Sequence, residues 1–209
     1  MESNNALSDL QKDALREIVN IGVGKGAALL GQMVNLSIQL SIPHVDVIKF
    51  KEISQFFTET LDENLFSVQL PFKGDYEGLS FVMFNEDSAN VLTAALTGLD
   101  INSKDLEELK EGALSEVGNI VLNAVMGSFS NILIDNLNFE LPTFKTGHFV
   151  NVFPEIFSNS DKNVMICKTD IKINYETILQ GEILIIYEID SYNKLLDKIN
   201  AFLSDINLL

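Results

Sequence analysis

An internal repeat is the feature of this sequence that most limits how it can fold. Residues 17–43 align with residues 116–142 at a constant offset of 99, without a gap. Each copy carries Glu, two further residues and Asn, and then 22 residues before a proline. Apolar residues alternate just before each proline, so we expect a helix followed by a strand in each copy.

The rest of each copy predicts a hairpin and a second helix. Residues 77–84 and 180–187 are β-rich runs at corresponding places, and the β-rich runs 65–72 and 164–173 precede them. Turn residues separate the two runs in each copy, which is typical of a hairpin. Helical patterns follow, over about 87–96 in the first copy and 191–203 in the second. Each half is therefore expected to be helix, strand, hairpin and helix.

Two such halves bury the most apolar surface by joining their strands into one sheet covered by helices. We therefore expect a single domain over residues 1–209, with one repeat at about 7–98 and the other at about 106–209. The expected fold is an α/β protein of the α+β type, with internal pseudo-two-fold symmetry, a mainly antiparallel sheet and the two motif helices adjacent. The short polar segments 102–105 and 158–161 are expected to be loops.

Charge and composition exclude several classes of function. The 209 residues are 46% apolar and carry 14 basic against 30 acidic side chains, a net charge of −16. Such a chain repels phosphate backbones and anionic membrane surfaces, so nucleic-acid and membrane binding are not expected. No stretch approaches eighteen apolar residues and the N-terminus lacks a signal-peptide pattern, so we expect a cytoplasmic protein. The single Cys167 lies in an apolar run and is expected to be a buried small hydrophobe.

The repeated Glu and Asn are the candidate functional residues. Glu17 and Asn20 in the first helix, like Glu116 and Asn119 in the second, fall outside the apolar arc at helical spacing. The sequence thus predicts that all four side chains are exposed. One E-x-x-N is an ordinary helix-surface pattern, but Asn is unfavourable inside a helix, and stability gives little reason to place it there twice. The repetition favours a functional pair.

The paired motif carries a family resemblance. The runs ALREIVNIGVGKGAALLGQM and ALSEVGNIVLNAVMGSFSNIL, each with E-x-x-N followed by 22 residues and proline, span corresponding parts of the two halves. With these motifs the chain resembles the CheC family of CheY-phosphate phosphatases, which includes the CheC, CheX and FliY types. Two motifs and the absence of room for an added flagellar-switch domain match the CheC type best.

The resemblance implies a phospho-aspartyl phosphatase (a hydrolase) whose substrate is a phosphorylated CheY-type response regulator. Asn20 or Asn119 would position a water in line with the phosphorus, and Glu17 or Glu116 would pair with the regulator's lysine. Mg²⁺ would be held by the regulator and not by this chain. Pro43 and Pro142 would be structural, each closing a strand. The resemblance leaves open a non-catalytic alternative, an adaptor that binds a CheD-type receptor deamidase or a response regulator. Internal duplication favours a monomer.

Other motifs have weaker interpretations. Residues 22–26 contain Gly-x-Gly-Lys-Gly but lack the P-loop spacing and follow a helix, so these glycines are expected to permit a bend or close helix contact. The two histidines, His44 and His148, have no zinc-ligand pattern beside them, and no intrinsic metal site is expected. The acidic residues at the start of the second motif helix are expected to form a solvated face: Asp105, Glu107, Glu108 and Glu111.

Overall fold

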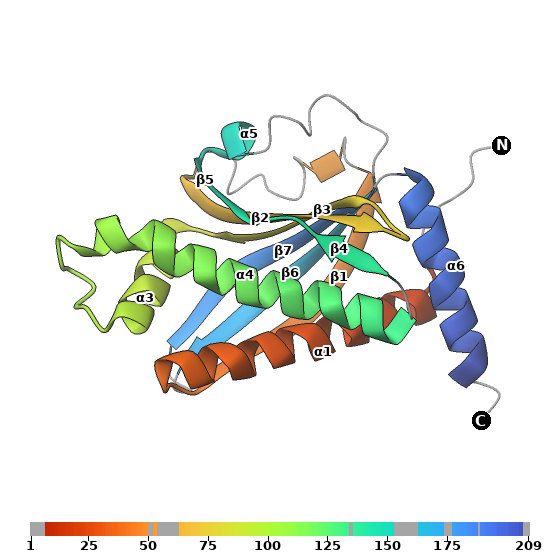
Figure 1. Cartoon of the computed structure of the whole chain (residues 1–209), viewed down its shortest axis with the longest axis horizontal. Helices are drawn as coiled ribbons and strands as arrows, with labels where there is room; N and C mark the ends of the chain where they lie inside the picture. The colour runs from red at the N-terminus through yellow and green to blue at the C-terminus, as the bar shows by residue number, and fades with distance from the viewer. Residues whose placement is uncertain are drawn as a thin grey trace.

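A computed structural model of the chain describes residues 7–49, 52–53, 63–133, 136–152, 163–173, 177–187 and 189–206. Its helices and strands follow the predicted order of helix, strand, hairpin and helix in each copy, except that the second copy has two short strands and a four-residue helix before its hairpin (Figure 1). In chain order they are α1 (Asp9–Val34), β1 (Ile38–Lys49), β2 (Leu65–Gly74), β3 (Gly78–Phe84), α3 (Glu86–Thr97), α4 (Leu106–Leu133), β4 (Leu137–Phe139), β5 (Thr143–Gly147), α5 (Phe149–Val152), β6 (Asn163–Ile173), β7 (Thr177–Tyr187) and α6 (Ile189–Ile206).

The described strands form one seven-stranded antiparallel sheet in the order β1-β6-β7-β3-β2-β4, with β5 also paired to β2. The two hairpins, β2 with β3 and β6 with β7, confirm the predicted ones. They meet at the β3–β7 pair, so the order is symmetrical about the centre of the sheet. This is the order that the predicted duplication requires, although the duplication itself stays an inference from the sequence.

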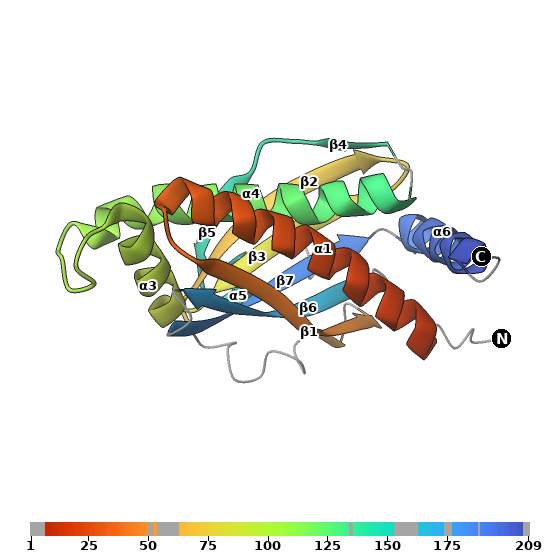
Figure 2. The same ribbon diagram turned by 90° about the horizontal axis from the view of Figure 1, so that it is seen from below.

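The two motif helices α1 and α4 lie against each other on one face of the sheet, as predicted (Figure 2). A Cβ built on Gly22 would lie 2.5 Å from the Cα of Val125, and one built on Gly26 would lie 3.3 Å from the Cα of Val121. Because the earlier glycine meets the later valine, the helices run antiparallel. Gly22 and Gly26 therefore serve close helix contact, one of the two predicted roles, and α1 continues through residues 22–26.

The start of α1 agrees with its sequence, because Ser8 followed three residues later by Gln11 is the pattern that predicts a capping box. Ser8 is the N-cap and forms a reciprocal capping box with Gln11, with Ser8 N donating to Gln11 Oε1 at 2.8 Å. The inner face of the helix is buried, including Leu15, Ile18 and Val19. Three apolar residues of the two motif helices are nevertheless exposed, namely Leu10, Ile21 and Leu109. At about 100° per residue they lie on the far side of their helices from the buried residues, so each buried face is narrower than the apolar pattern indicates.

Helices α3 and α6 cover opposite ends of the sheet (Figure 1). Helix α6 forms hydrogen bonds with both motif helices. Gln11 Nε2 in α1 donates to Asn200 Oδ1 at 2.9 Å, and Lys198 Nζ donates to the carbonyl of Leu133 at the end of α4 at 3.4 Å. The apolar side of α6 adds Tyr192, Leu195 and Ile199 to the core. The helix therefore closes the core at the end where α1 begins and α4 ends.

The Tyr192 hydroxyl is buried without a hydrogen-bond partner among the described residues, and burial raises the pKa of its phenol to about 12. An unfolded tyrosine ionises near pH 10. The folded state therefore keeps its proton longer than the unfolded state, and stability should fall as the pH rises from about 10 to 12. We expect Tyr192→Phe to be at least as stable as the wild type at neutral pH and to lose less stability over this interval. Urea unfolding at pH 8, 10 and 11 measures the free energy of unfolding and its pH dependence. A Tyr192→Phe variant less stable than the wild type at pH 8 would contradict the prediction.

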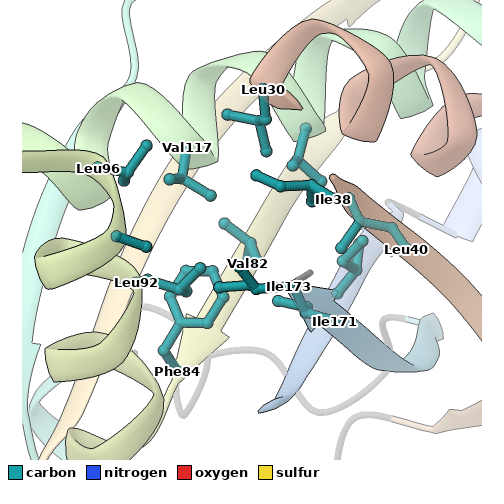
Figure 3. Close-up of a pocket in the computed structure, with 13 residues that line it drawn as sticks. Leu30, Ile38, Leu40, Val82, Phe84, Leu92, Leu96, Val117, Ile171 and Ile173 are labelled. Atoms are coloured by element: carbon teal, nitrogen blue, oxygen red, sulfur yellow. The ribbon is translucent and has the colours of Figure 1, made fainter. Parts of the chain in front are cut away.

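An apolar cavity of about 20 Å³ lies under the helices (Figure 3). Its walls come from α1, α3, α4 and the sheet, and include Leu30, Phe84, Leu92, Val117 and Ile173. Its lining exposes no polar surface, and its volume holds at most about one water. The cavity is therefore a packing void and offers no ligand site.

Candidate functional site

The side chain of Asn20 joins α1 to the edge strand β1. The backbone N–H of Ile42 donates to Asn20 Oδ1 at 2.8 Å, and Asn20 Nδ2 donates to the Ile42 carbonyl at 3.4 Å. The amide thus pairs with one residue of β1 as a neighbouring strand would. Asn20 is half-buried, so the prediction that it is exposed is wrong. A helical-wheel argument treats the helix alone and misses the strand that approaches it from the side.

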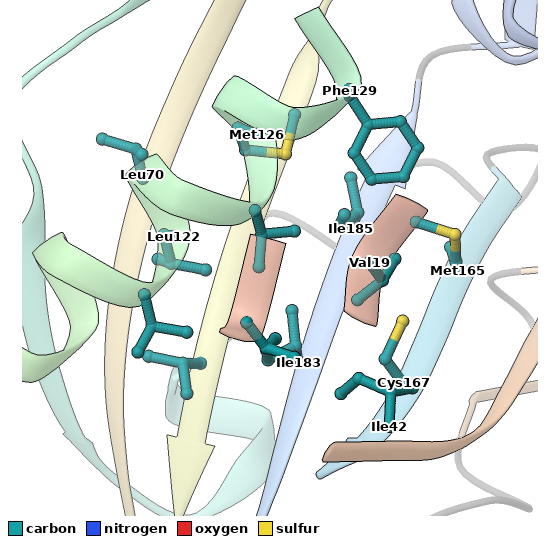
Figure 4. Packing of buried hydrophobic residues seen from close by; sticks show 14 of the residues in the cluster. Val19, Ile42, Leu70, Leu122, Met126, Phe129, Met165, Cys167, Ile183 and Ile185 are labelled. Carbon is teal, nitrogen blue, oxygen red and sulfur yellow. The ribbon is translucent and has the colours of Figure 1, made fainter. Parts of the chain in front are cut away.

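The 22-residue spacing of the motif follows from this contact. Ser41 pairs with Asp170 and His44 with Lys168, so one extra residue of β1 stands opposite β6 between these pairs. Such a bulge leaves backbone groups without ladder partners, and Asn20 bonds both polar groups of Ile42 there. The Ile42 side chain is 2% exposed and points into the core near Val19 and Cys167 (Figure 4). The bulge is therefore fixed by its backbone hydrogen bonds to Asn20 and by burial of the Ile42 side chain in the core.

The second copy has an interruption at the corresponding place but a different partner for its Asn. Phe72 pairs with Phe139 and Gln69 with Thr143, so the break between β4 and β5 contains one residue more than the stretch of β2 opposite it. Leu141, which aligns with Ile42, is 85% exposed. The chain here turns away from α4, with Glu140 N donating to the Pro71 carbonyl at 3.0 Å.

Asn119 consequently takes a partner on its own helix. Asn123 Nδ2 donates to Asn119 Oδ1 at 2.7 Å and to the Asn119 carbonyl at 2.8 Å. Asn119 is half-buried rather than exposed, but among the described residues its side chain bonds to nothing in the sheet. The sequence analysis missed Asn123. Its signal is an Asn one helical turn after the motif Asn, at a position where the first copy has Gly24.

Both motif glutamates are exposed, as predicted. Within the part of the chain that the structure describes, neither Glu17 nor Glu116 has an ion pair or a side-chain hydrogen bond. The antiparallel pairing of the helices sets Asn119 beside the α1 segment around Ala28, about 12 Å along the helix axis from Asn20. The structure therefore brings each Glu together with its own Asn and keeps the two pairs apart.

The prolines do not close strands, which corrects the sequence interpretation. Pro43 lies within β1, which continues to Lys49, and β5 resumes directly after Pro142. Pro43 lies within the bulge, together with Ile42, and Pro142 lies in the break between β4 and β5. At such interruptions a missing N–H removes no ladder hydrogen bond.

Polar groups surround the first motif. An open hollow beside it is lined by Asp9, Lys12, Asp13, Arg16, His44 and Val45. His44 Nε2 lies 2.7 Å from Asp46 Oδ2, because residues two apart in a strand share a face, and Lys12 Nζ lies 3.8 Å from Asp46 Oδ1. Over the described residues, no group of three or more His, Cys, Asp or Glu side chains could hold a metal ion.

Cys167, the acidic start of α4 and the lengths of the helices were also subjects of the sequence predictions. Cys167 is fully buried, and burial raises the pKa of its thiol, which disfavours the reactive thiolate. The acidic residues at the start of α4 are exposed, as predicted, and Glu107 also pairs with the buried Lys110. No helix in the described part of the chain combines the length and apolar character needed to cross a membrane.

The Asn20 contact makes a stability prediction. Asn20→Ala leaves both backbone groups of Ile42 without their side-chain partner, so we expect a loss of about 1–2 kcal/mol in the free energy of unfolding. Urea denaturation of the purified protein measures this. Glu17→Ala, on the same helix but exposed, is the control and should change stability by less than about 0.5 kcal/mol. Equal stability of the Asn20 and Glu17 variants would show that the contact contributes nothing.

Comparisons with known proteins agree on one fold. The chain resembles the crystal structure of Thermotoga maritima FliY with a TM-score of 0.75 and 21% identity, covering 94% of this chain and 98% of that one. It resembles the middle domain of Helicobacter pylori FliM with a TM-score of 0.61 and 14% identity, covering 92% and 99%. A CheX in a CheX–CheY–BeF₃–Mg²⁺ complex from Borrelia burgdorferi matches with a TM-score of 0.51 and 18% identity, covering 83% and 99%. The chain therefore has the α+β fold shared by these chemotaxis and flagellar-switch proteins.

Sequence comparison narrows this class. The chain is 25% identical over 206 residues to a Bacillus subtilis (strain 168) protein named CheY-P phosphatase CheC, covering 95% of this chain and 98% of that protein. It is 24% identical over 138 residues to the flagellar motor switch phosphatase FliY of the same organism, covering only 35% of that longer protein. A comparison with models of known protein families finds no match. The chain is thus a homologue of CheC along almost its whole length, which supports the CheC family as its family.

Proposed function

We propose that this protein is a phosphatase for the phospho-aspartate of a CheY-type response regulator, in chemotaxis or related two-component signalling. The end-to-end similarity to a protein named CheY-P phosphatase CheC supports this activity. So does the similarity in fold to a CheX whose structure was solved with CheY, BeF₃ and Mg²⁺. The observation that carries the proposal is the pair Glu116 and Asn119, on a face of α4 where neither side chain bonds to the described part of the sheet.

In this reaction the main task of the chain is to position the attacking water. A water attacks the phosphorus, the bond from phosphorus to the aspartyl oxygen breaks, and the products are inorganic phosphate and the free carboxylate. Phosphoryl transfer is accelerated mainly by positioning and charge neutralisation, and a side-chain amide that orients the water is sufficient for the first task. In this proposal Asn119 orients the water. Glu116 pairs with the regulator's lysine, and the regulator brings the Mg²⁺ that neutralises the phosphoryl oxygens.

The two motifs are proposed to contribute unequally. Asn20 bonds Ile42 through both its Oδ1 and its Nδ2, so β1 lies directly against the edge of the amide that a water would have to reach. Asn119 has no such contact with the sheet among the described residues. We therefore assign the main activity to Glu116 and Asn119, and a weaker second site to Glu17 and Asn20.

The test is the decay of a phosphorylated CheY-type receiver, with Mg²⁺ present, at increasing concentrations of this protein. Phosphate release should accelerate with protein concentration and saturate. A decay rate that stays at the spontaneous value for every receiver of the source organism would overturn the proposal. The adaptor alternative rests on the family resemblance, and no contact among the described residues favours it. Capture of CheD without any phosphatase activity would support that alternative.

A further inference from the structure

Asn123 lies one helical turn after Asn119 and holds its amide. A single Nδ2 group donates to both the side-chain oxygen and the backbone carbonyl of Asn119, at 2.7 and 2.8 Å. Both residues are half-buried within the 28-residue helix α4. The aligned position in the first copy is Gly24, where a built Cβ would meet nothing within 4 Å. Asn123 therefore belongs to the second motif alone.

Packing does not account for Asn at this position. Asn is a poor helix former, because its amide competes for backbone hydrogen bonds. Polar side chains in helices commonly donate to the backbone carbonyl four residues earlier. The second bond, to Asn119 Oδ1, is not explained in this way, and it joins Asn123 to the residue that we propose orients the water.

The orientation of that amide decides what it can offer a water. An asparagine amide has an acceptor side and a donor side of nearly equal shape, so a free side chain presents either one. A water that attacks phosphorus must direct a lone pair to phosphorus and donate hydrogen bonds from its O–H groups to acceptors. A donor bonded to one lone pair of Asn119 Oδ1 leaves the second lone pair for the water and disfavours the flipped amide. In the first copy the orientation is set by Ile42, but at the cost of both amide groups.

We propose that Asn123 is a positioning residue of the second motif, which holds Asn119 with its Oδ1 ready to accept a hydrogen bond from the attacking water. This inference rests on the proposed phosphatase function. It predicts a defect in the chemical step, with binding of the receiver unchanged, because Asn123 acts on Asn119 and not on the partner.

The experiment measures kcat and KM for a phosphorylated receiver in Asn123→Ala, Asn123→Asp and Asn123→Gln, with Asn131→Ala as the matched control. Asn131 is an exposed asparagine of the same helix. In Asn123→Ala we expect kcat to fall about tenfold, as for the loss of one neutral hydrogen bond, with KM within about twofold. Asn123→Asp should lose more, since a carboxylate cannot donate and repels Oδ1. Asn123→Gln retains a donor and should recover part of the rate.

Two further readouts separate positioning from a structural role. The melting temperature of Asn123→Ala should equal or exceed that of the wild type, because alanine is the better helix former. The side-chain amide resonances of Asn119, observed by NMR in the free protein, should shift and broaden in the same variant. Asn131→Ala should leave kcat, KM and these resonances unchanged.

The outcomes distinguish the two proposals. Wild-type kinetics in Asn123→Ala, with activity lost in Asn119→Ala, would overturn the role of Asn123 and leave the phosphatase function standing. A fall in kcat together with a lower melting temperature would assign Asn123 a structural role and also overturn the inference. A wild type inactive on every receiver would overturn both.

Discussion

Replacing Asn119 by alanine is expected to lower the protein-dependent rate of receiver dephosphorylation by roughly 10²-fold, the usual effect of removing one group that acts directly at the reacting centre. The physical reason is that alanine has no amide to orient the water, and the second site at Asn20 is assigned only a minor share of the activity. Glu116 lies one turn away on the same face but, in our assignment, is engaged with the regulator's lysine. The measurement is kcat and KM for decay of the phosphorylated receiver, and the loss should appear in kcat.

The matched comparison is Asn20→Ala, assayed at a temperature where both variants are fully folded. It should keep most of the activity and lose stability, because Asn20 serves β1 in the free protein. Asn119→Ala should show the opposite, with activity lost and stability kept. Equal losses of activity in the two variants would contradict the unequal assignment, and the double variant should then show whether the sites add. Full activity in the double variant would reject the water-positioning role of both residues.

The second large effect is on stability. We expect Gly22→Ala to lower the free energy of unfolding by roughly 2–3 kcal/mol. The added Cβ would stand 2.5 Å from the Cα of Val125 and 3.0 Å from the carbonyl oxygen of Ala124. Both are backbone atoms of α4, so no side-chain rotation relieves the clash and the two motif helices must separate. Urea denaturation measures the loss.

Gly24→Ala is the control from the same helix. Its Cβ would have nothing within 4 Å, and alanine is a better helix former than glycine, so this variant should gain about 0.5–1 kcal/mol. Two Gly-to-Ala changes two residues apart are therefore expected to act in opposite directions. If Gly22→Ala were as stable as Gly24→Ala, the close crossing of α1 and α4 would not contribute to the stability of the fold.

Local signals in the sequence predict many elements of this fold. The capping box at Ser8, the two hairpins and the helices that follow them appear as predicted, because each depends on neighbours in the chain. The adjacency of the motif helices also follows, since two amphipathic helices on one sheet face have little room elsewhere. The errors concern the width of the apolar faces, since Leu10 and Ile21 lie on the far side of α1 from its buried residues and are exposed.

The candidate site could be predicted in its residues but not in its contacts. The repeated E-x-x-N was visible because the offset of 99 brings two otherwise ordinary patterns into register. The partner of each Asn was not visible. Ile42 contributes only backbone atoms to Asn20, and the sequence of a strand does not state where its ladder is interrupted. Asn123 could not be recognised from the repeat, because the aligned position in the first copy is Gly24.

The sequence by itself determined the elements, their order, the pairing of Glu with Asn and the acidic surface, because these depend on residue type and on spacing along one helix or strand. Only the tertiary structure decided that the two motifs differ. Both copies carry the motif Glu and Asn, followed by a strand that is interrupted near the proline. In the first copy Ile42 of this strand bonds Asn20, whereas in the second copy Leu141, at the same position, is exposed. That difference arises from which strands and loops pack beside each helix, and such contacts join residues that the sequence holds far apart.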